Sequence, residues 1–303
     1  MDFGGLREVL EDLKGMIKRG KMSSNVEILM FHDVGETKEF GPQKYSVSER
    51  HFERVIGHYA ESHEFVRLEE ISKWLKGKGD LPDNAVAITF DDGYFSTKKK
   101  ALPILEEKNI PATVYVPSEH LDINYSFDFK LVSLVTNNEY IEFNYDGKDY
   151  YFNLESFGSR KMAYDQLRGL MKNLSVKERE TLLSKLGAQT ADSGSLMDIE
   201  DLKELDDHHL ISIGAHSTDH RNLTEIEKSK ARKSIINSKK ELEEILDHEV
   251  SSFSFPFGSR NNKIVEFVRS AGFSNSVVTE GRHISERDWG NVYEIPRVDG
   301  KDK

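Results

Sequence analysis

The chain has no cysteine among its 303 residues, which excludes disulfide bonds and thiolate metal ligands. A metal site in this chain must therefore be built from histidine, aspartate or glutamate. The sequence also lacks an uncharged hydrophobic run near the 18 residues of a transmembrane helix, and residues 1–20 lack the hydrophobic centre of a signal peptide. We therefore expect no transmembrane segment and a cytoplasmic location, with peripheral membrane association as the alternative.

Positive charge is also scarce, since 42 lysine and arginine residues stand against 53 acidic residues and give a formal net charge of −11. No basic cluster is dense enough or rich enough in aromatic residues to follow a nucleic-acid backbone, so nucleic acid is not an expected partner. Residues 6–19 show hydrophobic residues at helical spacing. We therefore divide the chain into an N-terminal helix within residues 1–24 and a larger domain over residues 25–303.

The larger domain alternates short hydrophobic runs with amphipathic segments. This alternation is typical of parallel strands joined by crossover helices, and it places the chain in the α/β class. The predicted strands are residues 26–31, 86–90, 112–116, 211–215 and 252–255, and the predicted helices are 49–62, 96–108, 224–246 and 264–271.

The alternation is interrupted between about residues 125 and 195. Residues 140–145 and 150–154 flank Asp146-Gly147, which predicts a β-hairpin. Two helices are expected to follow, and Ser175 with Glu178 predicts a capping box at the start of the second. We interpret this stretch as an inserted hairpin and helices without a hydrophobic core of its own.

Asp91 and Asp92 directly follow the predicted strand 86–90. The carboxyl ends of barrel strands are where α/β enzymes place catalytic side chains. The alternative is an ordinary turn, because Asp-Asp-Gly also favours turns and helix caps.

His216 and His220 follow another predicted strand, and their four-residue spacing places both imidazoles within reach of one ion. Asp92 can supply a third ligand and leave a coordination position open for water. The alternative is that the two histidines are ordinary surface residues.

Residues 255–258, Phe-Pro-Phe-Gly, end a third predicted strand. The tight turn exposes backbone N–H groups that could face a developing oxyanion. A turn with no role beyond ending the strand is the alternative.

These segments, residues 89–93, 216–220 and 255–258, resemble the motifs of the polysaccharide deacetylases, the NodB homology domain or carbohydrate esterase family four. The order and spacing also match, and the resemblance covers roughly residues 26–299. It implies a distorted (β/α) barrel with seven strands, so that residues 25–303 would form the catalytic domain.

The resemblance also implies roles for single residues. Asp91 would be the general base, and Asp92, His216 and His220 would hold a divalent cation, commonly zinc. The backbone N–H of Phe257 would help to hold the oxyanion. Substrate-binding positions are then expected at Tyr94, His32 and Pro256, although His32 could equally be a core histidine.

Two family positions differ here. The family usually has an arginine two residues before the proline of the third motif, where this chain has Ser254, and we predict that Arg297 replaces it. An arginine on the barrel rim is the alternative. The late Leu-x-His that supplies the general acid is absent, and His283 is the nearest candidate unless it is an exposed loop residue.

The predicted activity is metal-dependent hydrolysis of an N-acetyl group on a glycan that contains N-acetylhexosamine. Two alternatives stay open. The same scaffold could hydrolyse a non-sugar amide or an O-acetyl ester, or it could bind carbohydrate without turnover.

Overall fold

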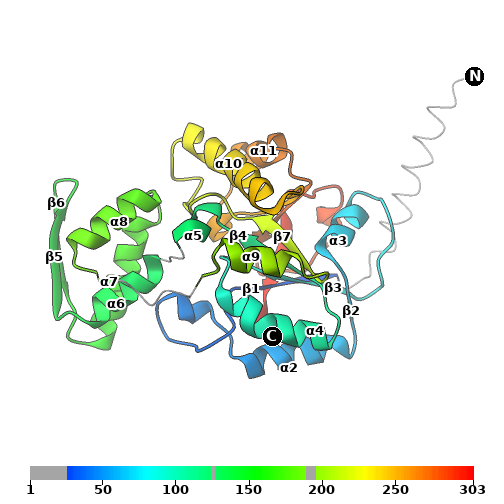
Figure 1. Cartoon of the computed structure of the whole chain (residues 1–303), viewed down its shortest axis with the longest axis horizontal. Coiled ribbons are helices and arrows are strands. Elements are labelled where there is room, and N and C mark those ends of the chain that lie inside the picture. Colours follow the sequence, from blue (N-terminus) through cyan, green and yellow to red (C-terminus); the bar gives the residue numbers. More distant parts are fainter. Residues whose placement is uncertain (1–25, 124–126, 189–195) are drawn as a thin grey trace, which may run out of the picture.

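The computed structural model describes residues 26–123, 127–188 and 196–303. The N-terminal helix predicted within residues 1–24 lies outside these ranges. Figure 1 shows a larger lobe, in which helices surround a central group of strands, and a smaller lobe that contains α6, α7, α8 and the β5–β6 hairpin.

In the described part of the chain, seven parallel strands close into a barrel in the order β1-β10-β9-β8-β7-β4-β3, with β3 pairing back to β1. A two-residue strand, β2, also pairs with β3. This arrangement confirms the predicted seven-stranded (β/α) barrel. The strands are β1 Glu27–Phe31, β2 Glu64–Phe65, β3 Ala85–Phe90, β4 Ala112–Val116, β7 Ile211–Ala215, β8 Ser252–Ser254, β9 Asn275–Thr279 and β10 Ile295–Asp299.

The barrel strands are hydrophobic because both of their faces are covered. Every residue of β1, β3 and β4 is buried, as expected for parallel strands that lie under helices. Neighbouring residues point to opposite sides, so Leu29 and Ile88 join one hydrophobic cluster while Ile28 and Ala87 join another. The barrel therefore has a packed interior as well as a packed outer layer.

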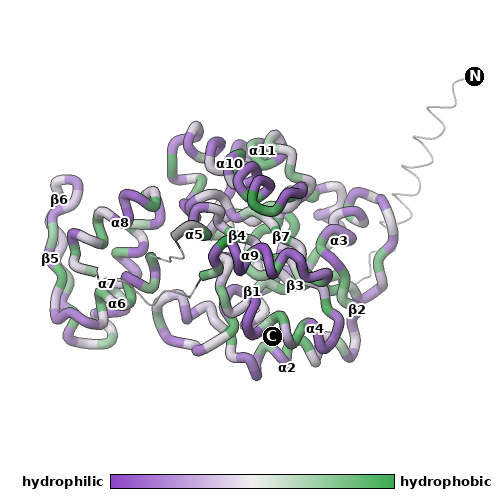
Figure 2. Tube along the Cα trace, viewed as in Figure 1, coloured by the Kyte–Doolittle hydropathy of each residue, from purple (hydrophilic) through white to green (hydrophobic). Residues whose placement is uncertain are grey.

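The helices of the larger lobe bury only one stripe each. The long helix α10 is mostly hydrophilic (Figure 2) and buries a stripe that includes Ala231, Ile235 and Leu242. The helices of this lobe are α2 Glu49–Ala60, α3 Leu68–Leu75, α4 Leu102–Glu107, α5 Ser118–Ile123, α9 Ile199–Asp206, α10 Lys228–Leu246 and α11 Asn262–Ser270.

Two predicted helix starts differ from the structure. The helix predicted from residue 224 begins at Lys228, because the Thr224 hydroxyl donates to Asn222 instead of capping a helix. The helix predicted from residue 96 begins with a π-helical turn, Thr97–Ala101, and α4 follows it. Pro103 lies in the first turn of α4, where its missing N–H removes a backbone donor.

The smaller lobe consists of α6 Phe127–Thr136, β5 Tyr140–Tyr145, β6 Lys148–Asn153, α7 Phe157–Met171 and α8 Val176–Lys185. The hairpin and the capping box of Ser175 and Glu178 form as predicted. The expectation that this insertion has no core of its own was wrong. Its helices and hairpin bury a separate cluster that includes Leu131, Phe152 and Leu167.

None of the described helices combines the length and the hydrophobicity needed to cross a bilayer.

Candidate active site and metal centre

The strand register brings the candidate residues to one end of the barrel. Phe31 pairs with Phe90, and Val116 pairs with Ala215. The residues that follow these pairs therefore emerge together at the carboxyl ends of the strands. His32, Asp91 and His216 each follow such a strand end directly.

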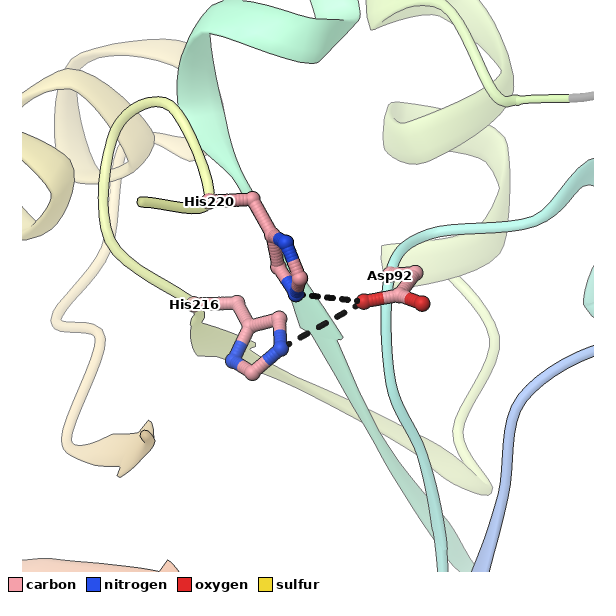
Figure 3. A group of neighbouring side chains, drawn as sticks. All are labelled: Asp92, His216 and His220. Carbon is pink, nitrogen blue, oxygen red and sulfur yellow. Dashed lines mark ion pairs between the residues drawn. The ribbon is translucent and has the colours of Figure 1, made fainter. Parts of the chain in front are cut away.

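Asp92, His216 and His220 converge as the sequence predicted (Figure 3). Asp92 Oδ1 lies 3.4 Å from His216 Nε2 and 3.1 Å from His220 Nε2. One ligand atom from each residue lies within 4.8 Å of the other two. No hydrogen-bond donor of suitable geometry reaches the buried Asp92 Oδ1 from the described residues.

Hydrogen bonding of His216 identifies the nitrogen that can bind a cation. His216 Nδ1 lies 2.8 Å from the carbonyl oxygen of Ser254. A carbonyl oxygen only accepts, so Nδ1–H donates and, in the neutral ring, Nε2 presents its lone pair to Asp92. A lone pair that faces a carboxylate oxygen favours a cation between them, and the donor set of two imidazoles and a carboxylate suits zinc.

The loops that carry these ligands adopt an unusual backbone conformation. Asp92, Ser217 and His220 have φ values of 74°, 64° and 52°, in the left-handed region that residues with a Cβ rarely adopt. The Ser217 hydroxyl accepts from the backbone N–H of His220 at 3.1 Å and so supports this turn. Strained backbone that the surrounding structure holds in place is typical of functional sites.

Asp91 lies beside the candidate metal centre and pairs with Arg297. Arg297 Nη1 and Nη2 donate to the two carboxylate oxygens of Asp91, each at 2.7 Å. Ser254 Oγ accepts from Arg297 Nη2 at 2.9 Å and lies 3.2 Å from Asp91 Oδ2. Burial alone would raise the pKa of Asp91, but the charge and hydrogen bonds of Arg297 hold that pKa below its usual value.

Arg297 is therefore an interior residue of the barrel, and the alternative of a rim arginine was wrong. Its side chain is fully buried, and its guanidinium also donates to Thr89 Oγ1 at 3.2 Å. It lies next to Asp91, where the family resemblance led us to expect a substitute for the arginine absent at Ser254.

A pocket of about 240 Å³ opens over these groups. Candidate ligands, the Asp91 carboxylate and several aromatic side chains line it together, which is the usual composition of a small-molecule site. Its lining residues are Met30, His32, Pro42, Tyr45, Asp91, Asp92, Tyr94, Asp128, Arg168, His216, His220, Phe255, Phe257, Gly258, Thr279 and Asp299.

Two aromatic residues predicted for the site lie in this pocket. Phe257 has a φ of 59°, and its ring packs edge-on against His220 with 4.6 Å between ring centroids. Tyr94 is 5% exposed, and burial together with the charges of Asp92 and Asp128 raises its pKa well above the usual value. The Tyr94 phenol is therefore protonated at neutral pH and can donate a hydrogen bond.

The other three predicted positions differ in placement. His32 lines the pocket, where its ring lies 5.5 Å from that of Tyr45. Pro256 is buried and is not among the lining residues of the pocket. His283 does not reach the pocket: its ring lies 3.2 Å from Glu27, the first residue of β1, at the opposite end of the barrel. The structure thus does not support His283 as the acid.

The insertion contributes two pocket residues that were not predicted from the sequence. Asp128 of α6 and Arg168 of α7 both line the pocket. No motif marks either residue, because each is one charged position in an amphipathic helix. Their contribution depends on how the smaller lobe packs against the barrel.

Comparison with known proteins agrees with this geometry. The family model for polysaccharide deacetylase matches residues 78–276, which are 199 of the 303 residues. The chain belongs to the polysaccharide deacetylase family. An 81-residue segment of this deacetylase-family chain is 37% identical to the poly-β-1,6-N-acetyl-D-glucosamine N-deacetylase of Staphylococcus aureus (strain MSSA476). That segment covers 26% of this chain and 27% of the relative, so the match spans about a quarter of the relative's length.

Two solved structures share the fold of this family member. The Streptococcus pyogenes deacetylase PplD, in complex with acetate, aligns with a TM-score of 0.61 and 15% identity, over 90% of this chain and 91% of that one. IcaB from Ammonifex degensii aligns with a TM-score of 0.61 and 18% identity, over 91% and 92% of the two chains.

Proposed function

We propose that this chain removes N-acetyl groups from a glycan that contains N-acetylhexosamine, by metal-dependent hydrolysis. The observation that carries the proposal is one pocket in which a buried carboxylate, Asp91, lies beside the candidate metal triad of Asp92, His216 and His220. The family membership and the 37% identical segment of a poly-N-acetylglucosamine deacetylase support the substrate class.

The triad residues would hold the cation, for which we propose zinc. A divalent cation bound there supplies Lewis acidity, which polarises the amide carbonyl and lowers the pKa of water. The ionised Asp91 carboxylate then accepts a proton as a water oxygen attacks the amide carbon. Arg297 does not touch substrate in this scheme; it orients Asp91 and keeps it ionised.

The negative charge that develops on the amide oxygen needs a hydrogen-bond donor. The backbone N–H of Phe257 is the donor that we propose, because the residue lies at the pocket in the tight turn after β8. Collapse of the tetrahedral species breaks the C–N bond and releases acetate. The leaving amine takes up a proton.

We propose His32 as the donor of that proton. Among the described residues, three histidines line the pocket, and His216 and His220 belong to the metal triad. His32 follows Phe31, which pairs with Phe90, so it emerges beside Asp91 on the neighbouring strand. His32 can therefore donate a proton to the same bound acetamide group from the adjacent strand end.

The test is acetate release from β-1,6-linked and β-1,4-linked N-acetylglucosamine oligosaccharides, with and without a chelator and with zinc added back. The proposal expects release that stops with the chelator and returns with zinc. Acetate only from O-acetylated glycans would favour the esterase alternative. Glycan binding without acetate release, in the presence of zinc, would show a binding protein and would overturn the proposal.

A further inference from the structure

The smaller lobe places an ion pair in the wall of the pocket. Arg168 Nε donates to Asp128 Oδ1 at 2.8 Å, and the hydroxyl of Tyr164 donates to the same oxygen at 2.7 Å. Tyr164 is fully buried and Asp128 is 8% exposed. Tyr164, which belongs to the core of the insertion, thus holds the pair in place, and both charged residues line the pocket.

Part of the pair's hydrogen-bonding capacity remains open. Within residues 26–123, 127–188 and 196–303, no group donates to Asp128 Oδ2, and no group accepts from the two terminal nitrogens of Arg168. None of these three atoms is among the buried polar atoms without a partner, so they face solvent in the pocket. The pair therefore offers one acceptor and several donors to a bound molecule.

Phe257 connects this pair to the catalytic end of the barrel. The Arg168 guanidinium lies 5.2 Å from the centroid of the Phe257 ring, and the His220 ring contacts the same ring with 4.6 Å between centroids. Arginine stacked on an aromatic face is held in one orientation while its N–H groups stay available. A molecule in the pocket can therefore contact the pair and the triad at the same time.

We propose that Asp128 and Arg168 recognise hydroxyl groups of the sugar whose acetamide is cleaved, and so determine which glycan this chain accepts. The inference rests on the function proposed above. A carboxylate accepts from a hydroxyl and a guanidinium donates to one, so the pair matches a neutral sugar diol. An anionic substituent fits less well, because Asp128 neutralises Arg168 and Asp299 also lines the pocket.

Because the pair lies on the insertion, substrate recognition and catalysis would depend on residues from different parts of the fold. The triad and Asp91 follow barrel strands, whereas Asp128 and Arg168 belong to helices that have their own core. A change in these helices can alter the shape and polarity of the pocket wall without moving the strand ends. The insertion thus acts as the substrate-selecting part of the site.

The experiment pairs a change in the protein with a change in the sugar. Acetate release by wild type and Arg168→Met is measured on β-1,6-linked N-acetylglucosamine oligosaccharides and on analogues with the C3 or the C4 hydroxyl replaced by hydrogen. Lys161→Met is the matched control, because Lys161 lies on the same helix and forms an exposed pair with Asp165.

We expect Arg168→Met to lower kcat/KM on the parent oligosaccharide by about 10–100-fold, the range for a hydrogen bond to a charged group. Replacing one of the two sugar hydroxyls by hydrogen should lower kcat/KM of the wild type by a similar factor. The two losses should not multiply, because each removes the same contact. Asp128→Asn should lower kcat/KM as well, whereas Lys161→Met should behave as wild type.

Losses that multiply on both analogues would show a structural role for Arg168 and would overturn the inference. The same conclusion would follow if Arg168→Met turned over the parent oligosaccharide as wild type does. If wild type released no acetate, the proposed function would fail by itself. The same cycle of variants and analogues, measured as dissociation constants by calorimetry, would then decide the inference on recognition.

Discussion

Arg297 on β10 and Asp91 after β3 face each other across the barrel interior through two parallel hydrogen bonds of 2.7 Å. The two residues lie 206 positions apart in the sequence, and the closure of the barrel brings them together by placing β10 beside β1 and β1 beside β3. A bidentate pair fixes the plane of the carboxylate as well as its charge. Asp91 is thus held ionised and oriented beside the triad.

Replacing Arg297 by methionine should impair the base without removing it. The folded-state pKa of Asp91 lies below its usual value because of Arg297, so the variant should have a higher Asp91 pKa. In the proposed mechanism the ionised form of Asp91 is the base, so the acidic limb of the kcat/KM profile should move to higher pH. Adding Ser254→Arg should move the limb back in part, because residue 254 already contacts Asp91. An unchanged limb in Arg297→Met would show that another group positions Asp91.

Asp91→Asn should lose about 10²–10⁴-fold in kcat, because an amide cannot accept the proton of water. The side chain keeps its size and its amide oxygen can still accept one of the two hydrogen bonds from Arg297, so the fold and the metal content should match wild type. Steady-state acetate release and elemental analysis of the same samples check both expectations. Turnover within a few-fold of wild type would remove Asp91 from the role of base.

His32→Gln should slow substrates with a poor leaving group most. An amine leaves only when protonated, whereas an aryl oxide leaves without an acid, so amide cleavage should fall further than cleavage of an aryl acetate. His283→Gln is the control, because His283 lies beside Glu27 at the far end of the barrel. Equal losses on both substrates for His32→Gln would contradict the assignment.

Packing inside the barrel makes a separate prediction about stability. A Cβ at Gly214 would lie 2.5 Å from the ring of Tyr115, so Gly214→Ala should destabilise the fold by about 1–3 kcal/mol. Gly169→Ala is the matched control: Gly169 lies on the exposed side of α7 with nothing near the new methyl group. The control should gain roughly 0.5–1 kcal/mol from helix propensity. Urea unfolding of wild type and the two variants tests this order of stability. A Gly214→Ala protein as stable as wild type would contradict the prediction.

The α/β alternation and the triad could be predicted from local sequence patterns, whereas the closed seven-stranded barrel was implied by the family resemblance. Buried parallel strands are continuous hydrophobic runs, and the residues after 86–90 and 211–215 stand out as carboxylates and spaced histidines. Arg297 was predicted from the family resemblance, because Ser254 stands where the family usually has an arginine.

The remaining features depend on contacts that sequence patterns do not report. His283 was predicted as the acid because it is a histidine late in the sequence. The loop after β9 that carries it returns to the amino end of β1. Asp128 and Arg168 carry no motif, and only the docking of the insertion on the barrel brings them to the pocket. The core of the insertion was missed because its hydrophobic residues are spread over two strands and three helices.

The most direct test of the central claim is the divalent metal content per chain of wild type and of the His216→Ala, His220→Ala double variant after dialysis, with acetate release from N-acetylglucosamine oligosaccharides measured on the same samples. The account predicts one ion per wild-type chain, and loss of both the ion and the acetate release in the variant. Equal metal content and equal acetate release in the two proteins would contradict it.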